Sequence, residues 1–117
     1  MYKVIIAGGR DFSDYSLLCT CADEALAGME DVEIVSGGAD GADALGERYA
    51  RERGFALKRF PADWKAYGHA AGPIRNGQMA AYADALIALW DGKSAGTRDM
   101  IRKAEEKGLR VVARLYS

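Results

Sequence analysis

The sequence predicts an α/β fold in which helices cover both faces of a parallel five-stranded sheet. Apolar runs of strand length alternate along the 117 residues with segments of helical periodicity, a pattern typical of parallel sheets. The runs at 3–7 and 85–90 are continuously apolar, as expected for strands buried on both faces. Those at 56–60 and 110–116 contain lysine or arginine, which indicates sheet edges. Right-handed crossovers then favour the strand order 3-2-1-4-5.

Length and composition predict one globular domain over residues 1–117, with half of its residues hydrophobic and 28% charged. Helices on both faces of its sheet would make three layers. The net charge of −1 argues against a surface that coats nucleic acid. No apolar run approaches the length of a membrane span, and the chain enters its first strand without a signal peptide, so we expect a cytoplasmic protein with no membrane partner. Cys19 and Cys21 point to different sides of a helix and His69 is the only histidine, so we expect no disulfide and no metal. We also expect no cofactor.

The segment at 32–43 contains a short apolar strand, a glycine-rich turn and the start of a helix. Gly37, Gly38 and Gly41 permit backbone angles that a side chain would forbid, and they allow a ligand to approach the chain closely. The first amides of a helix lack partners within it and carry partial positive charge, so such a turn can bind a phosphate. The alternative is a tight turn that only packs the helix onto the sheet.

The first two helices are predicted from apolar residues at helical spacing. Ser13 or Asp14 can cap the first helix, whose core face is expected to extend to Met29. The second helix, over 42–53, is expected to direct Glu47 and its charged neighbours into water.

The least regular part of the chain is predicted at 61–72, before a helix over 74–82 that has Pro73 at its first position. Trp64 and Tyr67 lie in this irregular part. Their rings either stack on a nucleobase or anchor the loop to the core, as aromatic residues in loops commonly do.

Glycine-rich loops follow the first, second and fourth strands, at 8–9, 37–41 and 92–96. The strand order reverses between the first and fourth strands, and ligands of such sheets bind there, at the carboxyl ends of the strands. Three such loops at one rim favour a phosphate-bearing ligand. A P-loop is excluded because its first glycine would fall on Ile87, and no dinucleotide or nucleophile-elbow motif follows a strand, so we do not expect NAD binding.

Several segments occur in the order seen in one known family, and they extend over nearly the whole chain. They are Gly8-Gly9-Arg10-Asp11-Phe12, Ser36-Gly37-Gly38-Ala39-Asp40-Gly41-Ala42-Asp43, Asp63-Trp64, Ala71-Gly72-Pro73-Ile74-Arg75-Asn76 with Met79, and Ser94-Ala95-Gly96-Thr97. In these segments the chain resembles the YspA-like proteins of the SLOG superfamily of Rossmann-like domains. That superfamily includes the Lonely Guy phosphoribohydrolases and the DNA-processing protein DprA. The resemblance implies a site for a nucleotide or nucleotide derivative at the glycine-rich rim.

One departure from the Lonely Guy enzymes bears on catalysis. Arg75 matches their arginine near the start of a helix, but alignment of Gly96 and Thr97 with their motif puts Met100 where those enzymes have a glutamate. The carboxylate that would assist glycosidic cleavage is therefore absent from that position. Asp91, Asp40 or Asp43 offers a carboxylate from another loop.

The predicted ligand-binding residues come from all three loops and from the start of the helix after Pro73. They are Gly8, Gly9, Arg10, Ser36, Gly37, Gly38, Asp40, Gly41, Asp43, Arg75, Asn76, Ser94, Gly96 and Thr97. A structural salt bridge is the alternative role for Arg10. Ser94 and Thr97 are expected to cap the last helix, with hydroxyls that can also contact a phosphate. Helix capping is the alternative for Asp40 and Asp43.

Three functions of different class follow from these features. The first is binding or sensing of a nucleotide or nucleotide-derived phosphorylated ligand, a small molecule, as the partner. The second is hydrolysis of an N-glycosidic or phosphoester bond in such a ligand, with no catalytic residue identified. The third and weakest is binding of single-stranded nucleic acid, which the net charge does not favour. Association into a homo-oligomer is left open.

Overall fold

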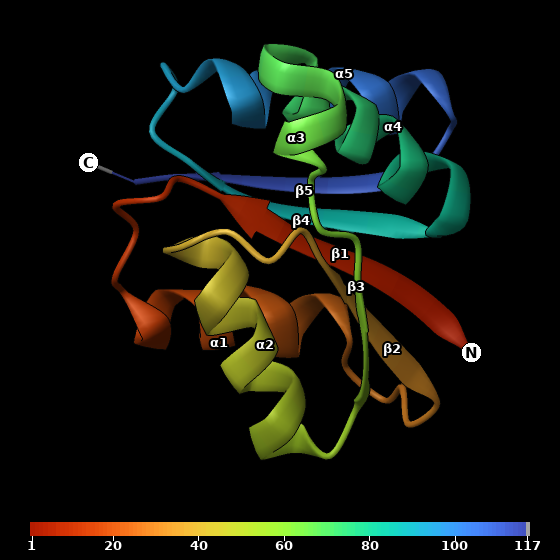
Figure 1. The fold of residues 1–117 in the computed structure, drawn as a ribbon. Helices are drawn as coiled ribbons and strands as arrows, with labels where there is room; N and C mark the ends of the chain where they lie inside the picture. The colour runs from red at the N-terminus through yellow and green to blue at the C-terminus, as the bar shows by residue number, and fades with distance from the viewer. Residues whose placement is uncertain (117) are drawn as a thin grey trace.

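The computed structural model describes residues 1–116 and contains one sheet of five parallel strands (Figure 1). The strands are β1 (Tyr2–Gly8), β2 (Val32–Ser36), β3 (Ala56–Arg59), β4 (Ala85–Trp90) and β5 (Arg110–Leu115). Their order, β3-β2-β1-β4-β5, confirms the predicted topology. The two continuously apolar strands, β1 and β4, are neighbours at the centre, and β3 and β5 form the edges.

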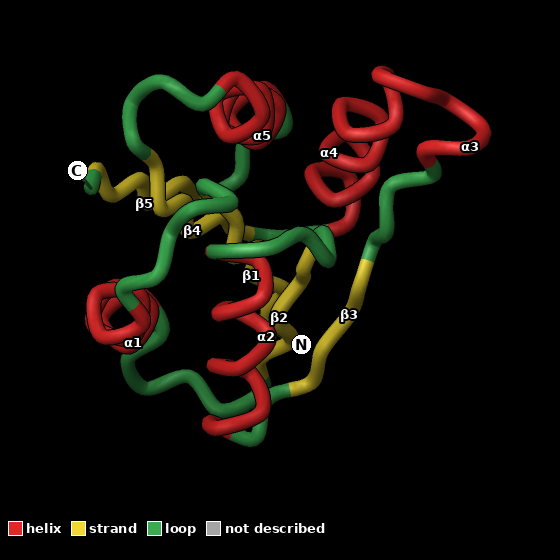
Figure 2. Tube along the Cα trace, turned by 60° about the vertical axis from the view of Figure 1, so that its left-hand side comes forward, coloured by secondary structure: helices red, strands yellow, loops and turns green. Residues whose placement is uncertain are grey.

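Helices cover both faces of the sheet, which confirms the predicted three layers (Figures 1 and 2). The helices α1 (Tyr15–Ala25) and α2 (Ala42–Arg53) lie on one face. The helices α4 (Ala71–Tyr82) and α5 (Ala95–Glu106) lie on the other. Between β3 and α4 the chain forms the one-turn helix α3 (Trp64–Tyr67) and the 3₁₀ turn η1 (Gly68–Ala70).

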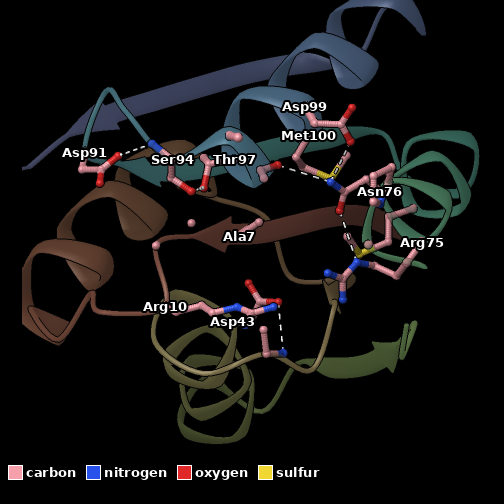
Figure 3. Close-up of a pocket in the computed structure, with 18 of the residues that line it drawn as sticks. Ala7, Arg10, Asp43, Arg75, Asn76, Asp91, Ser94, Thr97, Asp99 and Met100 are labelled. Atoms are coloured by element: carbon pink, nitrogen blue, oxygen red, sulfur yellow. Dashed lines mark hydrogen bonds between the residues drawn. The ribbon is translucent and has the colours of Figure 1, made fainter. Parts of the chain in front are cut away.

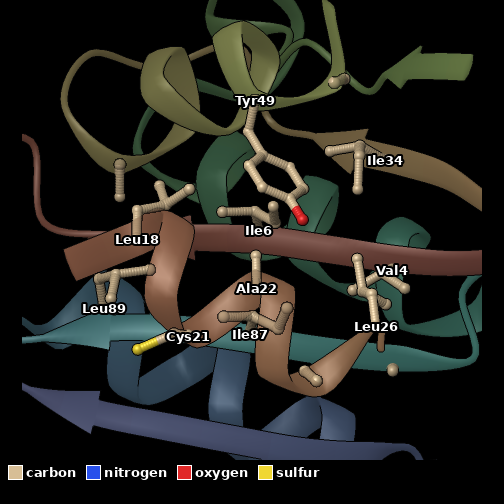
Figure 4. Close-up of a cluster of buried hydrophobic side chains, with 14 of the residues drawn as sticks. Val4, Ile6, Leu18, Cys21, Ala22, Leu26, Ile34, Tyr49, Ile87 and Leu89 are labelled. Atoms are coloured by element: carbon tan, nitrogen blue, oxygen red, sulfur yellow. The ribbon is translucent and has the colours of Figure 1, made fainter. Parts of the chain in front are cut away.

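Alternate residues of β1 face the two layers, as the period of two along a strand requires. Val4 and Ile6 pack with Leu18 of α1 and Tyr49 of α2 in one core (Figure 4). Ile5 and Ala7 belong to the second core, which includes residues of α4 and α5. Every residue from Val4 to Ala7 is apolar because side chains on both faces of β1 are buried in a core.

The first helix begins as predicted and ends earlier than predicted. The Asp14 carboxylate caps it by accepting a hydrogen bond from the Leu17 amide at 3.0 Å. The helix ends at Ala25, and Met29 is 37% exposed, so the assignment of Met29 to the core face was wrong. Leu26 is the C-cap residue, and the chain has left the helical path before Met29.

The segment at 61–82 is more helical than its sequence suggests. It contains α3 and η1 where an irregular loop was expected, and α4 begins at Ala71. Pro73 is therefore the third residue of α4, not the first. This position tolerates proline because the first four amides of a helix need no partner within it.

Among the described residues, no helix is long and apolar enough to cross a membrane. The same part of the chain holds no group of three or more histidine, cysteine or acidic side chains arranged to bind a metal.

Candidate functional site

A cavity of about 660 Å³ opens at the carboxyl ends of β1 and β4 (Figure 3). This volume lies within the range of small-molecule sites in proteins. Residues of the loops after β1, β2 and β4 line the cavity together with the first turns of α4 and α5. The three glycine-rich loops therefore meet at one rim, because the carboxyl ends of parallel strands lie at the same edge of a sheet.

Nine of the fourteen predicted residues line this cavity. They are Gly8, Gly9, Arg10, Asp43, Arg75, Asn76, Ser94, Gly96 and Thr97. A second cavity of about 290 Å³ is lined by Gly37, Gly38 and Asp40, and it shares four lining residues with the first. Ser36 and Gly41 line neither cavity. Contact of any of these residues with a ligand stays a prediction.

Ser36 is fully buried and holds the turn after β2 from beneath. Its hydroxyl donates to Glu47 Oε2 at 2.7 Å and accepts from the Gly38 amide at 3.0 Å. Glu47 also accepts two hydrogen bonds from Arg59. Burial alone would raise the pKa of Glu47, but the hydrogen bonds from Arg59 and Ser36 outweigh it and hold that pKa below its usual range.

Glu47 is only 7% exposed, so the expectation that it faces water was wrong. The prediction came from helical spacing, which puts Glu47 among the charged residues of α2. In the structure the Ser36 hydroxyl and the Arg59 guanidinium of β3 are its hydrogen-bond partners. A buried carboxylate is stable when it is paired in this way. Ser36 and Glu47 thus shape the loop, and neither lines a cavity.

The two arginines of the cavity have different surroundings. Arg75 is half-buried; its guanidinium donates to the Gly37 carbonyl at 2.5 Å and to Asn76 Oδ1 at 3.2 Å. Burial lowers the pKa of Arg75, while the nearby Asp43 opposes the shift. Arg10 is exposed, and the described residues include no ion pair or side-chain hydrogen bond that involves it, so the salt-bridge alternative finds no support.

Asp43 lies in the first turn of α2 and is only 5% exposed. Its Oδ2 atom accepts from the Ala39 amide at 3.2 Å. Burial raises the pKa of Asp43; the Ala39 amide and the Arg75 and Arg10 charges act in the opposite direction. Asp40 does not cap the helix, because the N-cap residue is Gly41 and no side chain bonds to the free amides there.

The raised pKa of Asp43 predicts a stability change in Asp43→Asn. A raised native pKa favours the protonated form, so the native state loses stability as pH rises above the unfolded value of 3.8 and through the raised value. Asparagine keeps an acceptor for the Ala39 amide and carries no charge. We expect Asp43→Asn to melt above the wild type at neutral pH, with a difference that shrinks as pH is lowered towards 3.8.

Thermal melts of the wild type and Asp43→Asn at a series of pH values measure this difference. The control is Asp40→Asn, which removes an exposed carboxylate from the same loop. Equal melting at neutral pH would contradict the prediction.

Asn76 connects α4 to the first turn of α5. Its amide nitrogen donates to Asp99 Oδ2 at 3.0 Å and to the Gly96 carbonyl at 3.3 Å. Asp99 also binds Arg102 and Lys103. Burial opposes ionisation of Asp99, but the hydrogen bonds from Asn76, Lys103 and Arg102 outweigh it and lower its pKa.

Asp99 lines the cavity and was not among the predicted residues. The signal for it was available, because Asp99 is two residues beyond Thr97 and directly before Met100. Met100 itself is buried in the wall of the cavity, where its thioether supplies apolar surface and no acid.

The loop after β4 is held by Asp91. Its Oδ1 atom accepts from the amides of Ser94 at 2.7 Å and Lys93 at 2.8 Å, and these bonds lower the pKa of Asp91. Ser94 occupies the N-cap position of α5, but its side chain makes no capping bond, and the Thr97 hydroxyl reaches only Ser94 Oγ at 3.5 Å. Neither hydroxyl caps α5, so the expected capping role was wrong, and the first-turn amides have no side-chain cap.

Trp64 and Tyr67 project from α3 and are each 52% exposed, so neither ring anchors its segment in the core. Trp64 lines both cavities. Tyr67 lines neither of them. An exposed indole at the mouth of a cavity is a surface on which a flat ring can stack.

Comparisons with known proteins agree with this architecture. The model of the YspA, cpYpsA-related SLOG family matches residues 2–67. The Gene 61 protein of Mycobacterium phage D29 is 36% identical over an alignment of 119 positions, and the alignment covers 96% of this chain and 95% of that protein.

A solved structure of similar fold is the X-ray structure of DNA processing protein A (DprA) from Streptococcus pneumoniae. It superposes with a TM-score of 0.76 at 21% identity and covers 100% of this chain. The chain spans about half of the DprA chain, 51% of its length. At this identity the likeness shows a shared α/β fold alone.

Proposed function

Because the chain belongs to the YspA, cpYpsA-related SLOG family, we propose that it binds a nucleotide or a nucleotide-derived phosphorylated ligand in the cavity at the carboxyl ends of β1 and β4. The observation that carries this proposal is the position of Arg10. It is an exposed guanidinium on the wall of the cavity, with no carboxylate partner among the described residues. A charge in this position suits an anionic ligand, because guanidinium groups bind phosphate oxygens in a bidentate manner.

The first turn of α5 supports a phosphate position on the opposite wall. Ser94, Ala95, Gly96 and Thr97 all line the cavity. The side chain of Ser94, the N-cap residue, makes no capping hydrogen bond, so the first amides of α5 are available to an anion. The partial positive charge of a helix N-terminus adds to the attraction.

Trp64 supports the nucleotide character of the ligand. Its half-exposed indole lines the same cavity as Arg10 and the first turn of α5. Stacking of a base on an aromatic side chain is worth about 1–3 kcal/mol, and it tolerates any base. In this proposal Trp64 binds the base while the cationic groups bind the phosphate.

Hydrolysis of the ligand is the second candidate, and the carboxylates of the cavity favour it. Asp43, Asp91 and Asp99 line the same cavity as the proposed phosphate position. Met100 cannot act as an acid, and Asp99 is held ionised by three donors, so a hydrolytic mechanism would depend on Asp11, Asp43 or Asp91.

Binding is tested by calorimetric titration of the purified chain with AMP, GMP, CMP and UMP, and by native mass spectrometry for molecules that co-purify. We expect at least one nucleotide to bind, and Arg10→Ala to weaken it. Arg51→Ala removes an exposed arginine of α2 that lines neither cavity, and it should bind as the wild type does. Absence of binding for every nucleotide and of any co-purified phosphorylated molecule would overturn the proposal. Release of free base or inorganic phosphate during incubation would establish hydrolysis instead of binding alone.

A further inference from the structure

Asp43 is the most buried charged side chain that lines the cavity. Its Oδ2 atom is occupied by the Ala39 amide, whereas its Oδ1 atom has no hydrogen-bond partner among the described residues. Every fully buried side-chain nitrogen or oxygen of the described residues does have a partner. The Oδ1 atom is therefore not sealed in the protein interior, and the cavity is the space that it faces (Figure 3).

The open oxygen needs a hydrogen-bond donor from the ligand. An ionised carboxylate has acceptors only, so it repels a phosphate oxygen and attracts a hydroxyl or an N–H group. Asp43 and Arg10 lie on one side of the cavity, and Ser94 and Thr97 lie on the other (Figure 3). Because the carboxylate repels it, a phosphate held by the exposed Arg10 guanidinium and the first turn of α5 leaves the uncharged part of the ligand to contact Asp43.

The other acidic side chains of the cavity are less suited to this task. Both oxygens of Asp99 are engaged, by Arg102 on one side and by Asn76 and Lys103 on the other. Asp11 is exposed and Asp91 is partly exposed, so water competes for their oxygens. A ligand without a hydrogen-bond donor at this position would leave the buried Oδ1 atom of Asp43 without a partner. Of these carboxylates, Asp43 therefore distinguishes most strongly between ligands with and without that donor.

We infer that Asp43 accepts a hydrogen bond from a free ribose hydroxyl of the ligand. A single open oxygen matches one hydroxyl, whereas a base edge with two adjacent donors, as in guanine, requires both carboxylate oxygens. The inference rests on the proposed function and specifies its ligand as a ribonucleotide whose sugar hydroxyl is unmodified. A donated hydrogen bond also favours the ionised form of Asp43, which burial alone disfavours.

The test compares matched ligands on the same protein preparation. The affinities of AMP, 2′-deoxy-AMP and 3′-deoxy-AMP are measured by calorimetry on the wild type, Asp43→Asn and Asp43→Ala. Guanosine monophosphate and its two deoxy analogues repeat the series with a different base. For the wild type we expect the loss of one hydroxyl to weaken binding roughly tenfold or more, to the same degree for both bases.

In Asp43→Ala we expect the ratio of ribose to deoxyribose affinity to fall to about one, because the acceptor is gone. Asp43→Asn has a single acceptor oxygen, which the Ala39 amide occupies, so an NH2 group replaces the open acceptor and the ratio should also fall. Asp99→Asn is the control, because Asp99 lines the same cavity but both of its oxygens already have partners. It should change the affinities for the ribose and deoxyribose ligands equally and keep the wild-type ratio. A ratio measured on one preparation is unaffected by any loss of folded protein.

Three results would overturn this inference. If the wild type binds both deoxy analogues as tightly as AMP, Asp43 does not bind a sugar hydroxyl. The same conclusion follows if the wild-type ratio persists in Asp43→Ala. If no nucleotide binds to the wild type and no phosphorylated molecule co-purifies with it, the proposed function fails together with this inference, and this outcome is distinguishable from the first two.

Discussion

Replacement of Arg10 by alanine is expected to weaken the binding of a nucleotide monophosphate by roughly tenfold to more than a hundredfold. The melting temperature should stay at the wild-type value. Both expectations have one cause: Arg10 is exposed on the wall of the cavity, and no partner among the described residues depends on it. Its guanidinium is therefore free to bind phosphate and contributes little to the folded state. Calorimetry and thermal melts on the same sample measure the two quantities.

Arg75→Ala is the informative comparison, because Arg75 bonds the Gly37 carbonyl and Asn76. It should lose affinity and also melt below the wild type, since a half-buried guanidinium linking the β2 loop to α4 is removed. Lysine at either position should recover only part of the affinity, because it keeps the charge but loses the forked geometry. If Arg10→Ala binds normally, the assignment of Arg10 to the site is wrong. If Arg75→Ala melts lower but binds normally, Arg75 is structural only.

Gly41→Ala is expected to lower the free energy of unfolding by about 4 kcal/mol, from a strained backbone conformation and a clash. Gly41 has φ 72° and ψ −124°, which side chains disfavour. An added Cβ would lie 2.2 Å from the Gly9 carbonyl oxygen and 2.5 Å from that of Arg10. The loops after β1 and β2 approach here, and the Ala42 amide donates to the Gly9 carbonyl at 3.1 Å. The substitution must separate these loops, so nucleotide binding should also be lost.

Gly38→Ala is the matched control, because Gly38 also has a positive φ of 74° but an added Cβ would meet no atom within 4 Å. It should lower the free energy of unfolding by only about 1 kcal/mol, the strain of a left-handed residue. Urea denaturation of both variants measures the difference. Equal destabilisation would show that backbone strain alone, and not the close approach of the two loops, explains the requirement for Gly41.

The fold could be predicted from the sequence because its determinants are local. The apolar runs of β1 and β4 indicate strands buried on both faces, and the charged residues of β3 and β5 indicate edges. Given the strand order, the loops after β1, β2 and β4 must share one rim. Seven of the nine predicted residues that line the cavity follow from this argument, and the other two, Arg75 and Asn76, were predicted from the start of the helix after Pro73.

The partners of individual side chains could not be predicted in this way. Periodicity places Glu47 among the charged residues of α2, yet Ser36 and Arg59 surround it. Asp99 lies on a helix with many charges, and only the approach of Asn76 across 23 positions draws it into the wall of the cavity. Such contacts depend on how the elements pack, which the pattern along one helix does not contain.

By itself the sequence determined the five-stranded α/β architecture and the rim at which a ligand is expected, since alternation, apolar runs and glycine-rich turns are properties of neighbouring residues. The tertiary structure alone decided which residues of that rim are free to bind. It leaves Arg10 exposed, opens one oxygen of Asp43 to the cavity, and encloses Ser36 beneath the turn. The physical reason is that a polar group is available to a ligand only when packing brings it no partner from elsewhere in the chain.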